Sequence, residues 1–413
     1  MRRALVPSSK AEAPAAPAAP SRPVLRLGGL DVAWRVSLGR IRCAAVRDGR
    51  LAAATDDGAV VFLDAGGAVA ARSAPVEDSE ANDVALGADG SWAVAAYDDG
   101  YARVASARDG ALLLEHAVAA PAAAGKRQRR VAATRVLALP RDRFAAAAGR
   151  LVHAVDARSG ALAHAVACDA PVRGLCAAPP EIQSWAYGCS HGGGVVLVAD
   201  DGSVAARLAS ARPLRALAAS ATWLAAATFD GAVELWDAAA PGDEPDGAVA
   251  LRSSCGCDGA QCAWSDLGDL AVSGARAAVF DFSGDAPHHP YRRGPAPAPG
   301  EPDPVPRVCM AEGPAVRVAW GPDGALATAA ADGVVRVWRP RGRLRKGGQG
   351  RADRPETMRP QFFAFPKRDA AHPSGDAAAP AALAWLGDGT VAACYEAGDV
   401  VAWRLPEEAA PAQ

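Results

Sequence analysis

Three cysteines within eight residues form the densest cluster of potential metal ligands in this chain. They stand in the segment Cys-Gly-Cys-Asp-Gly-Ala-Gln-Cys, at Cys255, Cys257 and Cys262. Thiolates of this kind bind zinc or another soft metal, and a fourth ligand would come from Asp258 or from a distant histidine, His288 or His289. The spacing lacks the paired Cys-x-x-Cys arrangement, and Cys262 falls in a strand pattern. We therefore favour a turn between strands over a metal site, and we predict no cofactor.

Residues suited to catalysis are sparse. Ser190 and His191 are adjacent, but neighbouring residues on a strand point to opposite faces, which argues against a nucleophile–base pair. The sequence also lacks the Gly-x-x-x-x-Gly-Lys phosphate loop and the His-Glu-x-x-His zinc motif. We predict that the protein is not an enzyme.

Two runs of basic residues could contact nucleic acid or an acidic partner. One is Lys-Arg-Gln-Arg-Arg at 126–130, and the other is Arg-Pro-Arg-Gly-Arg-Leu-Arg-Lys at 339–346. Such runs serve nuclear import, RNA phosphates or an acidic partner, although solvated loops explain them as well. An RNA-associated or ribosome-assembly protein is therefore the alternative function.

The overall composition is close to neutral. The chain has 44 Lys and Arg residues against 46 Asp and Glu residues, so no global field favours nucleic acid or a membrane. Apolar runs fall short of the roughly 18 residues that a membrane helix needs. Nine scattered cysteines, an odd number, suggest reduced thiols in an intracellular protein. We expect a cytoplasmic location, with a nuclear one as the alternative.

A repeated sequence motif indicates the secondary structure that carries these residues. The segments 318–338 and 383–403 each place two tryptophans 18 residues apart, with an Asp-Gly turn between short alternating apolar runs. Alternation followed by Asp-Gly predicts a β-hairpin, because glycine supplies the positive φ of the turn. A period of roughly 40 residues predicts a repeat architecture.

Eight such units can be recognised, and further short strands between them give about four antiparallel strands per unit. The hairpins lie at 51–63, 92–104, 144–155, 185–198, 223–237, 262–282, 318–338 and 383–403. Four antiparallel strands make one blade of a β-propeller. We predict an all-β propeller of eight blades, with seven as the alternative because the third and fourth units are degenerate. The strand at 31–38 is expected to complete the last blade and close the ring.

The expected domain organisation is a single propeller with two tails. Residues 1–23 form a disordered Ala/Pro-rich tail, residues 24–405 the propeller, and residues 406–413 a C-terminal tail. We expect a monomeric propeller within a complex.

The segments Glu-Leu-Trp-Asp at 234–237 and Asp-Gly-Val-Val-Arg-Val-Trp at 332–338 resemble the WD40 repeat family. The likeness extends over roughly 31–405, and features such as the closing Val-Ala-Trp at 401–403 look like a WD40 group of bacteria and algae without an assigned activity. The Gly-His dipeptide that typically opens a repeat is absent, and Trp-Asp survives only at Trp236 and Asp237. The resemblance implies a rigid, non-catalytic scaffold that mediates protein–protein interactions in a multiprotein complex.

Two long insertions are the candidate binding elements. Strand order places 284–306 and 339–358 on one face of neighbouring blades, and long loops on a rigid frame often carry recognition. The alternative is that these insertions are disordered and have no function. The candidate protein-binding residues on or beside these insertions are Arg292, Arg293, Arg343, Arg345, Lys346, Phe362, Phe363 and Phe365.

Acidic turn residues are expected on the opposite face. Turn chemistry alone accounts for them, yet together they could form an acidic arc that attracts a basic peptide. These residues are Asp56, Asp57, Asp98, Asp99, Asp332 and Asp399.

Overall fold

In the computed structural model, thirty-two β-strands form eight four-stranded antiparallel sheets. The structure describes residues 31–118, 131–177, 184–189, 194–210, 212–220, 223–229, 232–237, 251–252, 261–265, 269–273, 278–281, 308–309, 315–321, 324–330, 333, 335–338, 360–362, 380–387 and 389–405.

Each sheet is one blade, whose strands follow one another from the inner to the outer edge. Blade 1 contains β2 (Ile41–Arg47), β3 (Arg50–Thr55), β4 (Val60–Leu63) and β5 (Val69–Arg72). Blade 2 contains β6 (Ala81–Leu86), β7 (Trp92–Tyr97), β8 (Tyr101–Ser106) and β9 (Leu112–Ala117). Blade 3 contains β10 (Ala133–Leu139), β11 (Arg143–Ala148), β12 (Leu151–Asp156) and β13 (Leu162–Ala167). Blade 4 contains β14 (Val172–Ala177), β15 (Ser184–Cys189), β16 (Val195–Ala199) and β17 (Val204–Leu208).

The second half of the ring follows the same plan. Blade 5 contains β18 (Leu214–Ala219), β19 (Trp223–Thr228), β20 (Ala232–Asp237) and β21 (Leu251–Arg252). Blade 6 contains β22 (Cys262–Trp264), β23 (Asp269–Val272), β24 (Ala278–Asp281) and β25 (Val308–Cys309). Blade 7 contains β26 (Ala315–Trp320), β27 (Leu326–Ala330), β28 (Val335–Trp338) and β29 (Pro360–Phe362). Blade 8 contains β30 (Pro380–Gly387), β31 (Thr390–Tyr395), β32 (Asp399–Arg404) and β1 (Asp31–Ser37).

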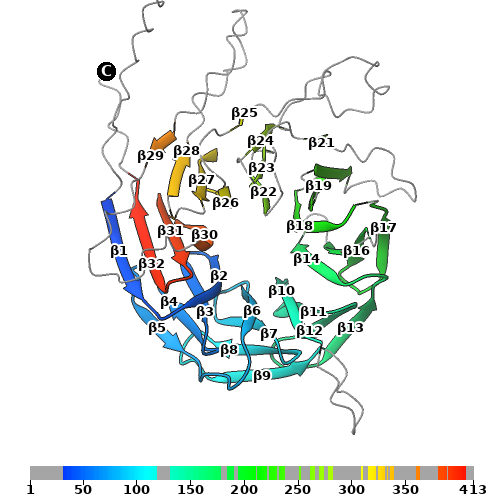
Figure 1. The fold of residues 1–413 in the computed structure, drawn as a ribbon. Helices are drawn as coiled ribbons and strands as arrows, with labels where there is room; N and C mark the ends of the chain where they lie inside the picture. The colour runs from blue at the N-terminus through cyan, green and yellow to red at the C-terminus, as the bar shows by residue number, and fades with distance from the viewer. Residues whose placement is uncertain are drawn as a thin grey trace, which may run out of the picture.

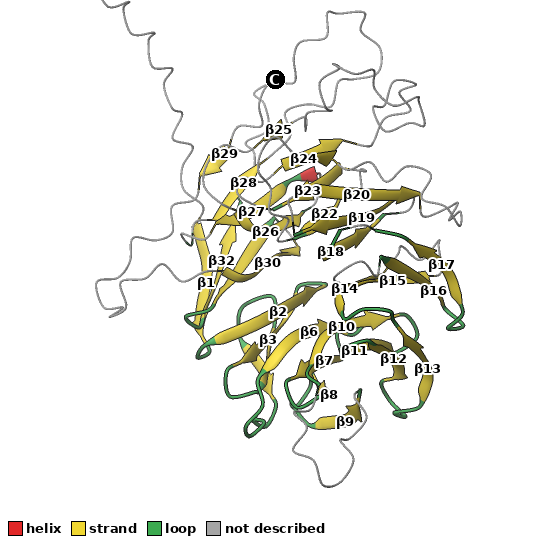
Figure 2. Ribbon diagram, turned by 45° about the vertical axis from the view of Figure 1, so that its right-hand side comes forward, coloured by secondary structure: helices red, strands yellow, loops and turns green. Residues whose placement is uncertain are grey.

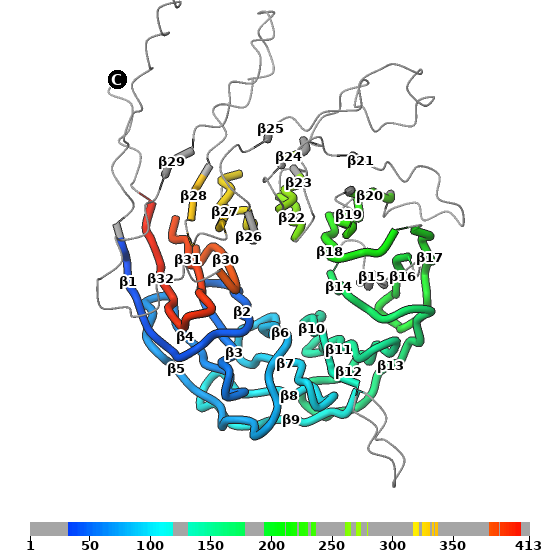
Figure 3. The backbone as a smooth tube through the Cα atoms, in the orientation of Figure 1, coloured from blue at the N-terminus to red at the C-terminus, as the bar shows by residue number. Residues whose placement is uncertain are grey.

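The blades form a closed ring around a central axis (Figures 1 and 3). Each inner strand contacts the inner strand of the next blade, in the order β2, β6, β10, β14, β18, β22, β26 and β30, and β30 returns to β2. Figure 2 shows the blades fanning outwards from the axis after a turn of 45°. The predicted all-β propeller is therefore confirmed, and the closed order of inner strands gives the eight blades rather than seven.

The N-terminal strand β1 completes the last blade, as the sequence predicted. It pairs antiparallel with β32, from Asp31 opposite Arg404 to Ser37 opposite Asp399. An ion pair of 2.7 Å between Arg35 and Asp399 joins the two strands across this seam. Closure removes a free sheet edge, which would otherwise be open to pairing with another chain.

Alanine supplies much of the core because the second strand of each blade is covered on both sides by its neighbours. The alanines at 52–54, 145–147 and 225–227 have no exposed surface. Small side chains at these positions let adjacent sheets pack closely, while larger residues such as Phe144 fill the space between them. The alanine-rich runs are thus strands, although alanine alone favours helices.

Tryptophan and tyrosine join consecutive blades through hydrogen bonds to backbone oxygens. Trp264 Nε1 donates to Ala218 O at 3.1 Å, and Trp320 Nε1 donates to Ala263 O at 2.9 Å. Trp385 Nε1 continues the series to Ala319 O at 3.0 Å. These repeated bonds fix each inner strand against the preceding one from blade 5 to blade 8.

The ring has two faces that the strand directions distinguish. We call the face that carries the second-to-third-strand turns and the connections between blades the turn face. β24 and β28, which precede the two insertions, end at the opposite face, while the insertions themselves lie outside the described residues. Within the described part of the chain, no helix is long and apolar enough to span a membrane.

Candidate functional site

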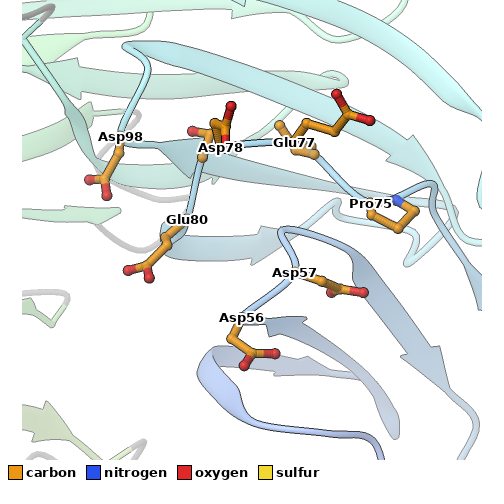
Figure 4. A pocket seen from close by; sticks show the side chains of 9 residues that line it. Asp56, Asp57, Pro75, Glu77, Asp78, Glu80 and Asp98 are labelled. Carbon is orange, nitrogen blue, oxygen red and sulfur yellow. The ribbon is translucent and has the colours of Figure 1, made fainter.

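A cavity of about 720 Å³ opens on the turn face between blades 1 and 2. Figure 4 shows the acidic side chains that surround it. The cavity is lined by Asp56, Asp57, Pro75, Val76, Glu77, Asp78, Ser79, Glu80 and Asp98. Six of these residues carry a carboxylate, so we call the cavity the acidic cavity.

The first wall is the turn between β3 and β4. Asp57 accepts hydrogen bonds from Thr55 Oγ1 at 2.6 Å and from Ala59 N at 3.1 Å, and it forms an ion pair of 2.6 Å with Arg72. Burial alone would raise the pKa of Asp57, but the bonds from Thr55, Ala59 and Arg72 outweigh it and hold the pKa below its usual value. Asp57 is thus chiefly a structural residue of the turn.

Gly58 in the same turn allows the chain to pass close beneath the cavity. Its φ is +77°, and an added Cβ would lie 2.8 Å from Ser79 O and 2.9 Å from Val76 Cβ. A side chain at this position would therefore push the connecting segment away. The turn of blade 1 and the connection to blade 2 form one packed unit.

The second wall is the connection from β5 to β6, residues 75–80. Val76 N donates to Asp57 O at 3.0 Å, which ties the start of the connection to the turn. Asp78 adopts a φ of +55°, a conformation that aspartate tolerates better than most residues. Glu80 forms an ion pair of 2.8 Å with Arg42 on the inner strand β2.

The third wall is the turn between β7 and β8. Asp98 N donates to Glu80 O at 3.0 Å, and the Asp98 carboxylate accepts a bond from Asn82 Nδ2 at 2.8 Å. Asn82 also donates to Ala133 O at 2.9 Å on blade 3. The position of Asp98 is therefore fixed by the connection that leads into blade 2 and, through Asn82, by blade 3.

The cavity has a net negative charge. Six carboxylates line it, and Arg42 and Arg72 neutralise one each, so four negative charges remain. Among the described residues, the carboxylates of Asp56, Glu77 and Asp78 accept no hydrogen bond and form no ion pair. They are available to an incoming cation.

The sequence predicted part of this site. Of the six turn acids expected on this face, Asp56, Asp57 and Asp98 line the cavity. Asp99 instead pairs with Arg103 at 2.6 Å and Asp399 with Arg35 at 2.7 Å, while Asp332 lies outside the described residues. Three of the six turn acids thus line a cavity between two blades, and the arc over four blades stays a prediction.

The acids of the connecting segment were missed by the sequence analysis. They are Glu77, Asp78 and Glu80. The available signal was the run Glu-Asp-Ser-Glu at 77–80 in a connection between blades, which joins the β3–β4 turn on the same face.

The candidate residues of the long insertions cannot be placed in the same way. Arg292, Arg293, Arg343, Arg345, Lys346, Phe363 and Phe365 lie outside the described residues. Phe362 ends β29, the outer strand of blade 7, and pairs in register with Arg336.

The cysteine cluster is also only partly described. Cys255 and Cys257 lie outside the described residues, whereas Cys262 is buried on β22, with its thiol 3.9 Å from Ala225 O. Burial raises the pKa of the Cys262 thiol to about 12, so the thiolate that binds metal is disfavoured. In the described part of the chain, no group of three His, Cys, Asp or Glu side chains is arranged to hold a metal ion.

Comparison with known families supplies one match. Residues 308–339 match the family described as WD domain, G-beta repeat. This segment is a WD40 repeat. It spans β25 to β28 and includes the seventh hairpin, where the sequence resemblance is clear. The WD40 assignment is confirmed for this part of the propeller. No curated protein matches the sequence.

Solved structures show the same architecture for almost the whole chain. The computationally designed Ika8 protein covers 91% of this chain and 98% of its own, with a TM-score of 0.61 and 15% identity. The similarity to the C-terminal WD40 domain of Sif2 covers 92% of this chain and 99% of that domain, with a TM-score of 0.61 and 13% identity. The similarity to BamB from Moraxella catarrhalis covers 93% of this chain and 100% of that protein, with a TM-score of 0.58 and 15% identity. At these identities the likeness shows the fold alone.

Proposed function

We propose that this WD40 propeller is a non-catalytic scaffold that binds other proteins, and that the acidic cavity receives a Lys- or Arg-rich segment of a partner. WD40 propellers generally bind proteins and are generally non-catalytic. The observation that carries the proposal is a cavity of about 720 Å³ lined by six carboxylates, of which the described residues neutralise two with guanidinium groups.

The physical complement of this cavity is a chain that carries several positive charges. Asp56 lies on the β3–β4 turn, and Glu77 and Asp78 lie on the connection to β6, all around one opening (Figure 4). Several basic side chains of one peptide can therefore pair with these carboxylates at the same time. Charge complementarity speeds association and selects the partner more than it adds affinity. The packed turn and connection fix the backbone that carries these carboxylates before binding, which lowers the entropic cost of association.

The wider role is a place in a multiprotein complex, for which a rigid ring with two separate faces is suited. The strands that precede the two long insertions, β24 and β28, end at the face opposite to the acidic cavity, so partners bound by the insertions and by the cavity would not overlap. The RNA-associated alternative depends on basic runs that lie outside the described residues and stays a prediction.

The test is the affinity of the full chain for a fluorescent lysine- and arginine-rich peptide, measured by anisotropy. The variant Asp56→Asn with Asp78→Asn removes two carboxylates that make no bonds within the described residues. Exposed charge pairs contribute about 0.5–1 kcal/mol each, so we expect the loss of two carboxylates to raise the Kd about five- to thirtyfold.

The matched control is Asp48→Asn with Asp169→Asn. Asp48 has a φ of +48°, close to the +55° of Asp78, so both variants place asparagine in the same backbone conformation. Asp169 is 84% exposed and lies in a different connection, between blades 3 and 4. Equal effects of the two variants, or no binding by the wild type, would contradict the proposal.

A further inference from the structure

Two histidines from neighbouring blades meet at the seam between blades 2 and 3. His116 lies on β9, the outer strand of blade 2, and His153 lies on β12, the third strand of blade 3. Both residues are half-buried, and His116 Nε2 lies 3.0 Å from His153 Nδ1. The ring planes are inclined by 69°, and the ring centroids lie 5.3 Å apart. We call these two residues the seam histidines.

The other blades show that the repeat does not require histidine at these two positions. Counted from the register shift of each outer strand, the equivalent residues at the seam between blades 3 and 4 are Val166 and Val196, which are buried in one apolar cluster. At the closing seam between blades 8 and 1 they are Val36 and Val61, which also share one cluster. The seam histidines therefore replace a valine pair that serves elsewhere in the ring.

The spacing of the two nitrogens is close to that of two ligands on one metal ion. A metal–imidazole bond is about 2.0–2.1 Å long, so two nitrogens at a right angle around the metal lie about 2.9 Å apart, and two at the tetrahedral angle about 3.3–3.4 Å apart. The observed 3.0 Å is nearer to the right angle. Right angles between ligands are typical of the tetragonal geometry of Cu(II) and Ni(II), whereas Zn(II) prefers a tetrahedral one.

Both rings are in the protonation state that binds metal. Burial lowers the pKa of His116 and of His153, and His153 lowers the pKa of His116 further. The seam histidines are therefore neutral at pH 7, and each neutral ring has one nitrogen with a free lone pair. In the absence of metal, one ring donates its N–H to the other. For both nitrogens to bind one ion, the donor ring moves this proton to its second nitrogen, so no proton is released.

The described neighbours of the two rings are small or apolar. Ala102 lies opposite His116 on the adjacent strand, and Ala146 and Ala165 lie on either side of His153. These methyl groups leave more room beside the rings than longer side chains would. The residues two positions away on each chain, which point to the same face, are Leu114, Val118, Leu151 and Val155.

The charged residues of β8 and β9 point away from the seam. They are Arg103 and Glu115, which form an ion pair of 2.7 Å with each other. Glu115 is adjacent to His116, and neighbouring residues on a strand point to opposite faces of the sheet. The guanidinium group of Arg103 therefore lies on the far side of blade 2 and does not repel a cation between the rings.

We propose that the seam histidines bind a divalent transition-metal ion, Cu(II) in preference to Zn(II), and that the ion clamps blades 2 and 3 together. Cu(II) binds nitrogen ligands more tightly than the other divalent ions of its row and accepts ligands at right angles. With two protein ligands, the remaining coordination positions fall to water, which reaches the half-buried rings. The site lies at a different seam from the acidic cavity, so it does not depend on the function proposed for that cavity.

The test is isothermal titration calorimetry of the full chain with Cu(II), Ni(II) and Zn(II) in separate experiments. The main variant is His116→Val with His153→Val, which places in this seam the residues that blades 3 and 4 already use and should keep the fold. Loss of a residue that only supports a metal ligand costs about 10–100-fold in affinity, so we expect the loss of both ligands to weaken Cu(II) binding at least about tenfold. The electron paramagnetic resonance spectrum of bound Cu(II) should show coupling to two nitrogens that the variant lacks.

The control variant is His164→Gln, which changes a half-buried histidine on the outer strand of blade 3 that packs against Gly202 of blade 4. It removes one imidazole but leaves the seam histidines intact, so Cu(II) binding should stay close to that of the wild type. A second variant, His116→Gln, removes one ligand and retains a polar side chain, so the result does not depend on the valine pair alone. Metal bound by other histidines and cysteines is common to all the proteins compared.

Thermal unfolding gives a second readout, because a metal that binds only the folded protein raises the Tm. Cu(II) should raise the Tm of the wild type and of His164→Gln, but not that of the valine variant. The proposal is overturned if the wild type binds no metal, because the seam histidines then form a hydrogen bond only. It is also overturned if the valine variant binds Cu(II) as tightly as the wild type, which would show an adventitious ion only. Tighter binding of Zn(II) than of Cu(II) would overturn the right-angled geometry.

Discussion

The hydroxyl of Tyr97 offers a clean test of how neighbouring blades are joined beneath the acidic cavity. Tyr97 is 2% exposed at the end of β7, and its hydroxyl donates to Gly58 O at 2.8 Å on blade 1. The Arg103 guanidinium lies 4.8 Å from the centre of the same ring. Tyr97→Phe keeps the ring and this cation–π contact but removes the hydroxyl.

The expected cost follows from the burial of the acceptor. Without the hydroxyl, the carbonyl of Gly58 loses a hydrogen bond in a place that water does not reach readily. A buried polar group that loses its partner costs about 1–3 kcal/mol. We expect Tyr97→Phe to lower the free energy of unfolding by about 1–2 kcal/mol.

Urea unfolding followed by circular dichroism measures this change as a lower midpoint with an unchanged slope. Tyr395→Phe is the internal comparison, because the Tyr395 hydroxyl makes the corresponding bond to Gly333 O at 3.0 Å between blades 8 and 7. Tyr97→Leu should cost more than Tyr97→Phe, since it also removes the ring and leaves a cavity. A midpoint unchanged in both phenylalanine variants would refute the reasoning.

Two further predictions concern the seams between blades. Arg35→Ala should lower the free energy of unfolding by up to about 1 kcal/mol, because Arg35 is 40% exposed and water partly screens its ion pair with Asp399. A double-mutant cycle with Asp399→Asn measures the coupling energy between the two side chains. Purely additive effects of the two substitutions would contradict the pairing. His116 Nε2 lies 3.0 Å from His153 Nδ1 between blades 2 and 3, and burial lowers the pKa of both, with His153 also lowering that of His116. In the unfolded chain both histidines have a pKa of about 6.5, so they bind more protons there than in the folded protein. The free energy of unfolding should therefore fall as the pH drops from 7 towards 5. His116→Gln should flatten this dependence in thermal melts at several pH values, and an equally steep dependence in the variant would argue against the pair.

Much of the fold could be predicted because the repeat is local. Each hairpin is specified by alternating apolar residues and an Asp-Gly turn, and β3 and β4 lie within a residue of the expected bounds. The role of β1 could be predicted because the last unit lacks an outer strand and the chain begins with an unpaired one. These inferences need only periodicity and the requirement that sheet edges be paired.

The candidate site was harder to predict because it depends on which acids already have partners. Asp399 and Asp56 look alike in the sequence as turn acids, yet Asp399 pairs with Arg35 across the closing seam and Asp56 remains available. Such relations arise from the ring and not from any single repeat.

The closing blade sets the order in which this protein can be completed. Three of its strands, β30 to β32, are the last described strands to be synthesised, and the fourth, β1, is the first. β1 is therefore synthesised first and its partner β32 last, so β1 stays without its partner until β32 has been made. The pairing of Asp31 with Arg404 spans most of the chain, so it carries the largest loop-closure cost and should form late. Until that step the nascent ring is an open arc with an unpaired edge at each end, and this is when the chain is most in need of protection from aggregation.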